Sequence, residues 1–352
     1  MVRQTYTLYC HEDTDGGIAA AIYGQHILRK YKSYGWEVEI TSVAHGLPMD
    51  DWSCREISFP CAILDFSLHS QFLNERFFQK AQPWIRKLGA AERIPPCAWI
   101  DHHPTGSTFS VLTPENISEA IPQAVVKWDT KSISTPGLLR THHKELGIPQ
   151  DIIQTWEEYI DIAEIVDGAL FATPDAAHDF SSPAVQMQTL FSTEHPLVDR
   201  GALFGRLVRD VMADPNPERL LERDPLYPAI LEYECDRHIQ RVQFYERYTT
   251  RVKNVAVSNF IHHNNFPGLS RFLPYVLFPD VEYAVQVLPK LKGMASISCG
   301  INPWKKTLHP NKHLGNFFAE NFFGGGHSFV AGGKVAEEDS YMINNLVEFL
   351  CE

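Results

Sequence analysis

The sequence predicts two α/β domains, an N-terminal one built on a parallel sheet and a smaller C-terminal one, joined by a helical linker. Its 352 residues exceed the usual size of a single folding unit. The first half alternates short apolar runs with helical patterns, as parallel sheets with crossover helices do. A charge-rich helical stretch then precedes a second group of strand-like runs. We expect the first domain at residues 1–195, the linker at 196–250 and the second domain at 251–352.

The first half of the chain supplies the elements of the expected parallel sheet. Strand-like runs lie at 6–11, 37–43, 61–65 and 98–101, and helical patterns lie at 14–30 and 71–88. Helical spacing returns at 135–145 and at 152–166. We expect these last helices to close the first domain.

The second half of the chain begins with a helix and continues with strands. Mixed apolar and charged spacing at 215–250 predicts a connecting helix, although a plain surface helix would show the same pattern. Strand-like runs follow at 252–257, 275–278, 283–287 and 295–299, then a helix near 314–320 and a glycine run at 324–326. This order predicts the smaller α/β domain.

Composition excludes several classes of protein. With 44% hydrophobic and 21% charged residues, the chain reads as an ordinary globular protein, not a disordered one. Its net charge of -12 disfavours the binding of long duplex nucleic acid. The seven cysteines form no CxxC pair, which argues against a disulfide framework and a zinc ribbon. The chain lacks a signal-peptide core and a membrane-spanning apolar run, so we expect a cytoplasmic protein without a membrane partner.

The strongest chemical signal follows the first strand-like run, at residues 11–17, HEDTDGG. His11, Asp13 and Asp15 alternate, so on an extended chain they point the same way at the carboxyl end of a strand, where open α/β sheets bind ligands. The two glycines allow a sharp turn, and the helix that follows brings its positive N-terminal dipole near any bound phosphate. The alternative is that one aspartate is simply the N-cap of that helix.

Further acids follow apolar stretches in the same manner. Asp65 follows the run 62–64, the run 97–100 leads into Asp101, His102 and His103, and Asp167 ends a helix, where a carboxylate opposes the helix dipole. Taken alone, Asp65 is more readily explained as a turn or cap residue. Together with two imidazoles, these carboxylates suit a metal site with hydrogen-bonded supporting groups.

The chain resembles the DHH phosphoesterase superfamily in the order and approximate spacing of four motifs. These motifs are HxDxDG, a lone Asp after a strand, DHH and a later Asp. Residues 324–327, GGGH, resemble the signature of the substrate-binding domain found in its RecJ-like and nano-RNase branch. The resemblance spans nearly the whole chain. It implies a DHH catalytic domain at 1–195 and a DHH-associated substrate-binding domain at 251–352.

The resemblance implies ligands for two manganese ions: His11, Asp13 and Asp65 for one, and Asp15, Asp65, His102 and Asp167 for the other. Mg²⁺ or Co²⁺ would substitute, because carboxylates and imidazole suit such ions. A hydroxide held by both metals would attack phosphorus in line. Asp101 would fix the tautomer of His102, and His103 would face the scissile phosphate as a charge stabiliser or a proton donor.

The resemblance also implies substrate-binding residues in the second domain: Gly324, Gly325, Gly326 and His327. Where an arginine is expected ahead of the glycines, residues 296–300 read SISCG. Arg271 is a candidate anion clamp, although a salt-bridged surface arginine explains it more readily. The histidine pairs at 142–143 and 262–263 are better explained as solvated surfaces than as a third metal site.

The function implied is a manganese-dependent phosphodiesterase, a 3′–5′ exonuclease that hydrolyses short RNA and linear dinucleotides such as pGpG to 5′-mononucleotides. The alternatives are a 3′-phosphoadenosine 5′-phosphate phosphatase and a cyclic-dinucleotide phosphodiesterase. The glycine motif makes a pyrophosphatase or polyphosphatase less favoured. A catalytically silent nucleotide-binding protein would predict the loss of a ligand, and every ligand is present. The oligomeric state stays open, a homodimer included.

Overall fold

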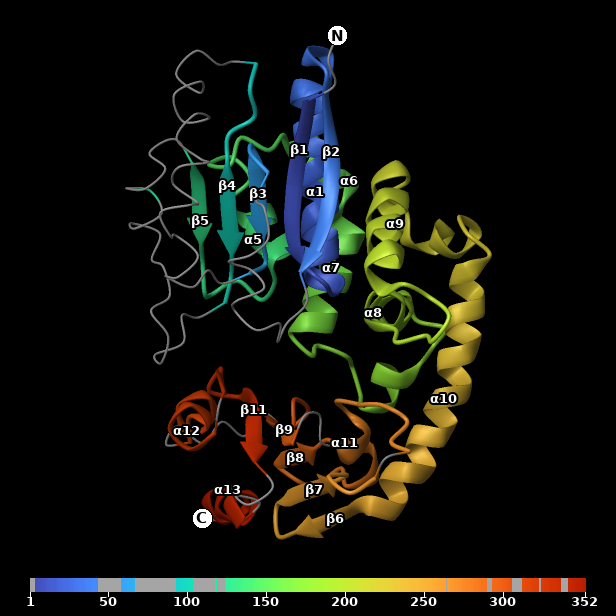
Figure 1. Cartoon of the computed structure of the whole chain (residues 1–352), viewed down its shortest axis with the longest axis vertical. Helices are drawn as coiled ribbons and strands as arrows, with labels where there is room; N and C mark the ends of the chain where they lie inside the picture. Colours follow the sequence, from blue (N-terminus) through green and yellow to red (C-terminus); the bar gives the residue numbers. More distant parts are fainter. Residues whose placement is uncertain are drawn as a thin grey trace. The chain divides into compact units, whose positions relative to one another are not determined.

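The computed structural model describes residues 4–43, 58–66, 93–103, 118, 124–263, 265–289, 293–305, 312–322, 324–336 and 341–352 (Figure 1). The chain divides into two compact units. Unit 1 contains Met1–Thr105, Phe109–Leu170 and Phe180–Leu231, and unit 2 contains Phe171–Asp179 and Glu232–Glu352. Both units are α/β, so the predicted fold class is confirmed.

Unit 1 is built on a five-stranded, fully parallel sheet in the order β2-β1-β3-β4-β5. Its strands are β1 (Gln4–His11), β2 (Trp36–Val43), β3 (Cys61–Leu64), β4 (Ala98–Asp101) and β5 (Val125–Trp128). In the register, Leu8 of β1 lies opposite Ile40 on one side and Ala62 on the other. Because the strands are parallel, their carboxyl ends share one edge of the sheet. The sequence predicted all of these strands except β5.

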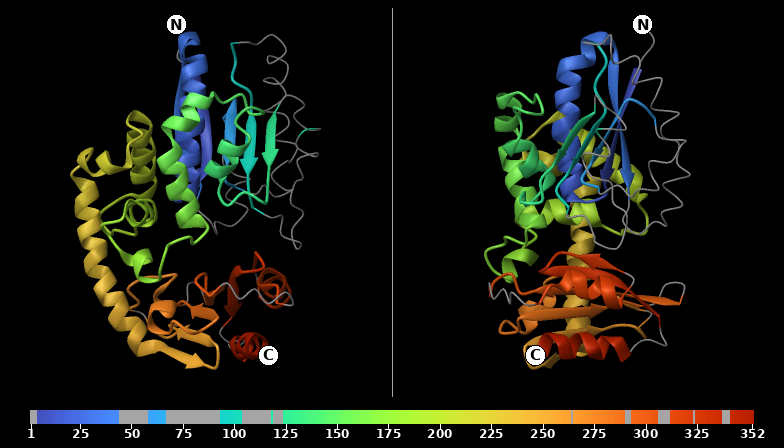
Figure 2. Two further views of the ribbon diagram at one scale, coloured as in Figure 1. Left: turned by 180° about the vertical axis from the view of Figure 1, so that it is seen from behind. Right: turned by 90° about the vertical axis from the view of Figure 1, so that its left-hand side faces the viewer.

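The helices of unit 1 include α1 (Thr14–Tyr31), α5 (Thr135–Thr141), α6 (Gln150–Thr155), α7 (Glu157–Asp167), α8 (Pro183–Ser192) and α9 (Arg200–Ala213), with 3₁₀ turns η1 (Lys32–Tyr34) and η4 (Pro217–Glu222). Helices α1, α5, α6 and α7 lie on one face of the sheet (Figure 2). The start of α1 packs tightly against the strand before it, because a Cβ on Gly16 would lie 2.3 Å from the carbonyl oxygen of His11. A glycine is therefore required there.

Some helical predictions for unit 1 need correction. The helix expected at 152–166 is broken at the fully buried Trp156, whose Nε1 donates to Oε1 of Gln25 at 2.6 Å. Helix α9 lies in the segment expected as linker and packs against α1 and β2. The helix expected at 71–88 lies outside the described residues.

The connecting helix expected near 215–250 is α10 (Leu226–Tyr248), which begins in unit 1 and continues in unit 2. Its last turn carries the buried Tyr245, which packs with Phe260 and Leu273 in a small aromatic core of unit 2. No helix among the described residues is long and apolar enough to cross a membrane.

Unit 2 contains a six-stranded mixed sheet in the order β10-β11-β9-β8-β7-β6, in which only β7 and β8 are parallel neighbours. The strands are β6 (Thr249–Val252), β7 (Val255–Asn259), β8 (Tyr283–Val287), β9 (Met294–Ile301), β10 (Gly325–Gly326) and β11 (Val330–Ala336). Helices α12 (Leu314–Asn321) and α13 (Tyr341–Cys351) pack Phe318 and Leu346 against the strand residues Val285 and Ile297. The 3₁₀ turn η3 (Asp175–His178) also belongs to this unit.

Two strand predictions for unit 2 are wrong in detail. The run at 252–257 is strand at Val252, which ends β6, and at 255–257, which begin β7, but a hairpin turn at residues 253–254 interrupts it, where Lys253 has a positive φ of 53°. The run at 275–278 belongs largely to a short helix, α11 (Leu273–Leu277). Pro274 lies in the first turn of α11, where a missing N–H costs nothing.

Candidate metal centre

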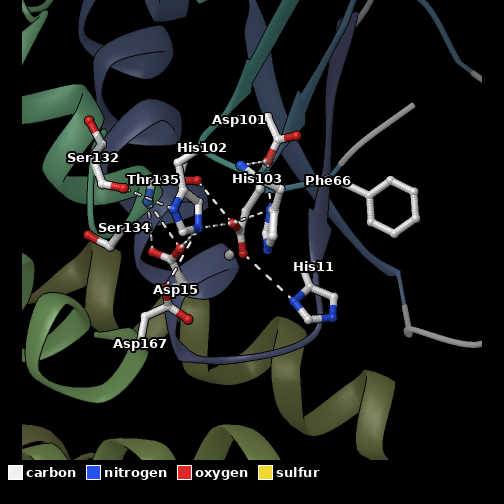
Figure 3. Close-up of polar contacts among 12 residues, drawn as sticks. His11, Asp15, Phe66, Asp101, His102, His103, Ser132, Ser134, Thr135 and Asp167 are labelled. Carbon is white, nitrogen blue, oxygen red and sulfur yellow. Dashed lines mark hydrogen bonds and ion pairs between the residues drawn. The ribbon is translucent and has the colours of Figure 1, made fainter. Parts of the chain in front are cut away.

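The sequence-predicted site residues of unit 1 all gather at the carboxyl edge of its parallel sheet (Figure 3). At this edge the end of β1 supplies one residue, the end of β3 supplies one and the end of β4 supplies three, and the start of α1 and the last turn of α7 supply the others. The residues are His11, Asp13, Asp15, Asp65, Asp101, His102, His103 and Asp167. Four stretches that are far apart in sequence therefore converge.

The first ligand group consists of His11, Asp13 and Asp65, each offering one atom within 4.8 Å of the others. Nδ1 of His11 lies 2.6 Å from Oδ2 of Asp13 and 3.7 Å from Oδ2 of Asp65. Oδ1 of Asp13 accepts the backbone N–H of Gly16 at 2.9 Å, so this residue is also the N-cap of α1. The capping and the metal-ligand interpretations of Asp13 are thus compatible, because each uses a different oxygen.

The second ligand group consists of Asp15, His102 and Asp167, again within 4.8 Å of one another. Nε2 of His102 lies 3.2 Å from Oδ2 of Asp15 and 3.8 Å from Oδ2 of Asp167. The same nitrogen lies 3.4 Å from Oδ1 of Asp65. Asp65 therefore directs one oxygen to each group, as a bridging carboxylate must.

Asp65 is held in an unusual backbone conformation. Its φ is 59°, a left-handed value that costs free energy for a residue other than glycine, although Asp tolerates it better than most. Its backbone N–H donates to the carbonyl oxygen of Ile100 on β4 at 2.9 Å, and its side chain is 1% exposed. Strain of this kind often marks a functional site.

The buried polar atoms at this edge fit a bound cation. Within the described part of the chain, Oδ2 of Asp65 and Nε2 of His102 are buried, and their polar neighbours at 3.2 to 3.8 Å do not have the geometry of a hydrogen bond. A buried polar atom left in this state costs free energy that a metal bond would recover. Carboxylate oxygens together with imidazole nitrogens suit divalent ions such as Mn²⁺.

Thr135, at the start of α5, supports both ligand groups and was not predicted from the sequence. Its backbone N–H donates to Oδ2 of Asp15 at 3.0 Å, and its hydroxyl donates to Oδ1 of Asp65 at 3.0 Å. The preceding Ser134 caps α5 by accepting the N–H of Gly137 at 3.0 Å. The cap signature Ser-Thr-Pro at 134–136 was the available signal, since it places free N–H groups at a helix start.

The expected partnership of Asp101 needs correction. Its Oδ1 lies 2.8 Å from Nδ1 of His103 and accepts the backbone N–H of that residue at 3.2 Å, so the structure assigns it to His103. Nδ1 of His102 instead lies 3.3 Å from the carbonyl oxygen of Ser132. With Nδ1 donating to that carbonyl, Nε2 of His102 is left as the metal-facing atom.

The crowded charges shift the protonation of the cluster. Burial lowers the pKa of His11, but the carboxylates of Asp13 and Asp65 outweigh it and raise that pKa to about 11. Burial likewise lowers the pKa of His102, but Asp15 and Asp65 outweigh burial and raise that pKa to about 12. Burial and the neighbouring charge of Asp65 raise the pKa of Asp15 well above its usual range. Without metal, the cluster therefore retains protons that a bound cation must displace.

The predicted substrate-binding glycines lie in unit 2. Gly325 and Gly326 form β10, which pairs with β11. A Cβ on Gly324 would lie 2.0 Å from the carbonyl oxygen of Gly332, and Gly326 has a φ of 144°, so packing and backbone conformation require both glycines. Around Gly325, by contrast, a Cβ would meet none of the described residues within 4 Å.

The remaining histidines and the predicted arginine have simpler environments. Nε2 of His142 lies 3.0 Å from Oδ2 of Asp129, and the ring of His263 lies 3.9 Å from that of Tyr248. Neither histidine joins a metal-binding group among the described residues. Arg271 is exposed in unit 2, and its guanidinium lies 5.4 Å from the centre of the Phe272 ring.

Comparisons with known proteins bear on the fold. No family model matches the sequence, and no curated protein matches it. Among solved structures, the pGpG-specific phosphodiesterase PggH from Vibrio cholerae matches with a TM-score of 0.62 and 15% identity, over 97% of this chain and 97% of that one. An exopolyphosphatase-related protein from Bacteroides fragilis matches with a TM-score of 0.52 and 15% identity, over 99% of this chain and 94% of the other. These likenesses show that the chain shares its overall fold with these two proteins.

Proposed function

We propose that this chain is a metal-dependent phosphodiesterase that hydrolyses short oligoribonucleotides and linear dinucleotides, such as pGpG, to 5′-mononucleotides. One observation supports the proposal: two groups of candidate metal ligands at one sheet edge share Asp65, an arrangement that suits two-metal hydrolysis. The likeness in fold to a pGpG-specific phosphodiesterase supports the substrate class.

The residues fit two divalent cations. His11, Asp13 and Asp65 would hold one, and Asp15, His102, Asp167 and the second oxygen of Asp65 would hold the other. We favour Mn²⁺, with Mg²⁺ or Co²⁺ as substitutes, because oxygen-rich sites with imidazole suit these ions. When bound, the pair would supply Lewis acidity and a hydroxide at neutral pH, so no protein nucleophile is needed.

His103 is suited to the charge that develops on the leaving oxygen. Burial lowers its pKa, but the hydrogen bond to Asp101 and the charge of Asp65 raise it above the usual value of histidine. A protonated imidazole at this edge can stabilise negative charge or donate a proton. Asp101 acts through His103 as a positioning residue, because it holds Nδ1 at 2.8 Å. His103→Ala should reduce turnover with a changed pH profile, and unchanged turnover across pH would contradict this role.

The preference for short substrates rests on charge. A net charge of -12 repels a long polyanion, whereas a dinucleotide needs only metal contacts and one end-binding segment. In this proposal the glycine segment 324–326 with His327 and Arg271 binds the nucleotide. A homodimer and a cytoplasmic location stay predictions.

The substrate class can be tested in one experiment. The purified protein is incubated with Mn²⁺ and, in parallel, with pGpG, a longer RNA, 3′-phosphoadenosine 5′-phosphate, a cyclic dinucleotide and polyphosphate, and the products are separated by chromatography. We expect pGpG to give GMP and the rate to fall as the RNA lengthens. A rate independent of RNA length would contradict the preference for short substrates. Full activity after exhaustive chelation would contradict the metal mechanism.

A further inference from the structure

A short hairpin of unit 2 displays an aromatic side chain on its surface. The turn at residues 327–329 joins β10 to β11, and Phe329 within it is 49% exposed. The ring of His327 lies 5.1 Å from that of Phe329 at an interplanar angle of 24°, so the two rings are stacked. About half of Phe329 therefore stays open to solvent although His327 stacks on its ring.

The backbone of this hairpin is held in place by its own carbonyl groups. The carbonyl oxygens of His327 and Ser328 accept the N–H groups of Gly315 and Leu314, at 2.8 and 3.1 Å. The carbonyl oxygen of Phe329 accepts the N–H of Ile301 at 2.9 Å. These bonds use two backbone donors at the start of α12, so they are not available to a phosphate. The hairpin instead offers an aromatic ring on a rigid support.

We propose that Phe329 is a stacking platform for a nucleobase of the substrate, an inference that rests on the proposed function. Every nucleobase has a π-face, and stacking on an aromatic side chain contributes to binding without requiring a particular base. A platform built on an ordered backbone loses little conformational entropy when it binds. Among the residues that the structure describes, none lies within 4 Å of the position that a Cβ on Gly325 would take, which leaves room for the rest of a nucleotide.

This assignment makes Phe329 a specificity-determining residue. A ring that stacks on a base improves the binding of nucleotides and does nothing for a polyphosphate chain, which has no base. The platform therefore separates nucleotide substrates from inorganic ones by KM, not by the chemistry at the metal centre.

The test compares ligands that differ only in the base. Phe329→Ala is measured beside Phe329→Tyr, which keeps the ring, and Tyr341→Ala, which removes another exposed aromatic of unit 2 (58% exposed). We expect Phe329→Ala to raise the KM for pGpG about tenfold with kcat nearly unchanged, and the two other variants to behave like the parent. For an abasic analogue of pGpG, the parent and Phe329→Ala should have the same kcat/KM.

Calorimetry supplies a readout independent of turnover. The parent should bind GMP about tenfold more tightly than ribose 5-phosphate, and Phe329→Ala should bind both alike. If pGpG is cleaved but Phe329→Ala leaves its KM and the GMP preference unchanged, the platform is refuted while the proposed function stands. If the parent cleaves none of the nucleotide diesters, the proposed function itself fails.

Discussion

The ligand group around His102 is supported by backbone groups of the segment 132–135, whereas the support of Asp13 in the group around His11 comes from the start of α1. Asp15 accepts the backbone N–H of Thr135, and His102 faces the carbonyl oxygen of Ser132. In the other group, Asp13 commits one oxygen to capping α1, and its side chain is about as exposed as that of Asp167, at 36% against 35%. Preorganised ligands bind a metal more tightly, because less order has to be imposed on binding. We therefore expect the His102 group to fill first and the His11 group to fill at higher metal concentration.

The largest expected effect comes from Asp65, the residue common to both groups. Asp65→Asn removes the bridging charge but keeps a side chain that tolerates the positive φ of 59°. We expect phosphodiesterase activity to fall on the order of a thousandfold or more, because both cations lose a ligand. Activity assays with pGpG and Mn²⁺ titrations measure it.

The control for this loss is Asp151→Asn, an exposed carboxylate of unit 1 whose side chain is 61% exposed. It should keep full activity. Thermal unfolding of both variants checks that the fold is retained. An Asp65→Asn protein that still binds two ions with parental affinity would show that the two groups do not depend on a shared carboxylate.

The second prediction concerns pH, through the imidazoles of the two groups. The pKa values of about 11 for His11 and about 12 for His102 lie above neutrality in the metal-free protein, so a cation must displace protons. Raising the pH removes the competing protons and strengthens binding, by about tenfold per pH unit for each proton displaced. Lowering the pH weakens binding.

Calorimetry with Mn²⁺ in buffers of different ionisation heat counts these protons. We expect two Mn²⁺-binding steps, each of which releases protons. The His102→Gln variant should lose the tighter of these two steps. A binding heat that is independent of the buffer would contradict the protonated state of the cluster.

Most of the metal-ligating pattern is predictable because it is local. His11, Asp13 and Asp15 stand at alternate positions after a strand, and Asp65 and the segment 101–103 also follow apolar runs. Parallel strands bring such positions to one edge, so the convergence follows from the strands themselves. The short, half-buried β5 carries too little alternation to be recognised.

The partners of the supporting groups could not be predicted in the same way, although the Ser-Thr-Pro cap signature at 134–136 indicates free N–H groups there. Thr135 holds Asp15 through its backbone N–H, and Ser132 holds His102 through its carbonyl oxygen, and every residue carries such groups. The exchange of partners at Asp101 depends on the rotation of two adjacent imidazoles, which a sequence does not encode locally. Helix α11 was mistaken for a strand because a short apolar run suits both states.

The third prediction tests the support that Thr135 gives to Asp65, the carboxylate that the two groups share. Thr135→Val removes the hydroxyl that donates to Asp65 at 3.0 Å but keeps the shape of the side chain and the backbone N–H. We expect about a tenfold loss of Mn²⁺ affinity and activity, as is usual when a group that orients a metal ligand is removed. Thr135→Ser keeps the hydroxyl and should stay near the parent. Equal losses in both variants would assign the effect to packing instead of the hydrogen bond.

The smallest expected effect separates the two uses of Asp13. Asp13→Asn keeps an oxygen that can accept the N–H of Gly16, whereas Asp13→Ala removes it, and both variants lose the ligand charge. Both should therefore lose metal at the His11 group to the same extent. In the metal-free protein, the difference in stability between the two variants measures the contribution of the N-cap hydrogen bond. We expect the free energy of unfolding to be about 1 kcal/mol lower for Asp13→Ala than for Asp13→Asn. Denaturant unfolding in the presence of a chelator measures this difference. Equal stabilities would mean that the oxygen facing Gly16 contributes nothing to α1, leaving metal binding as the one use of Asp13.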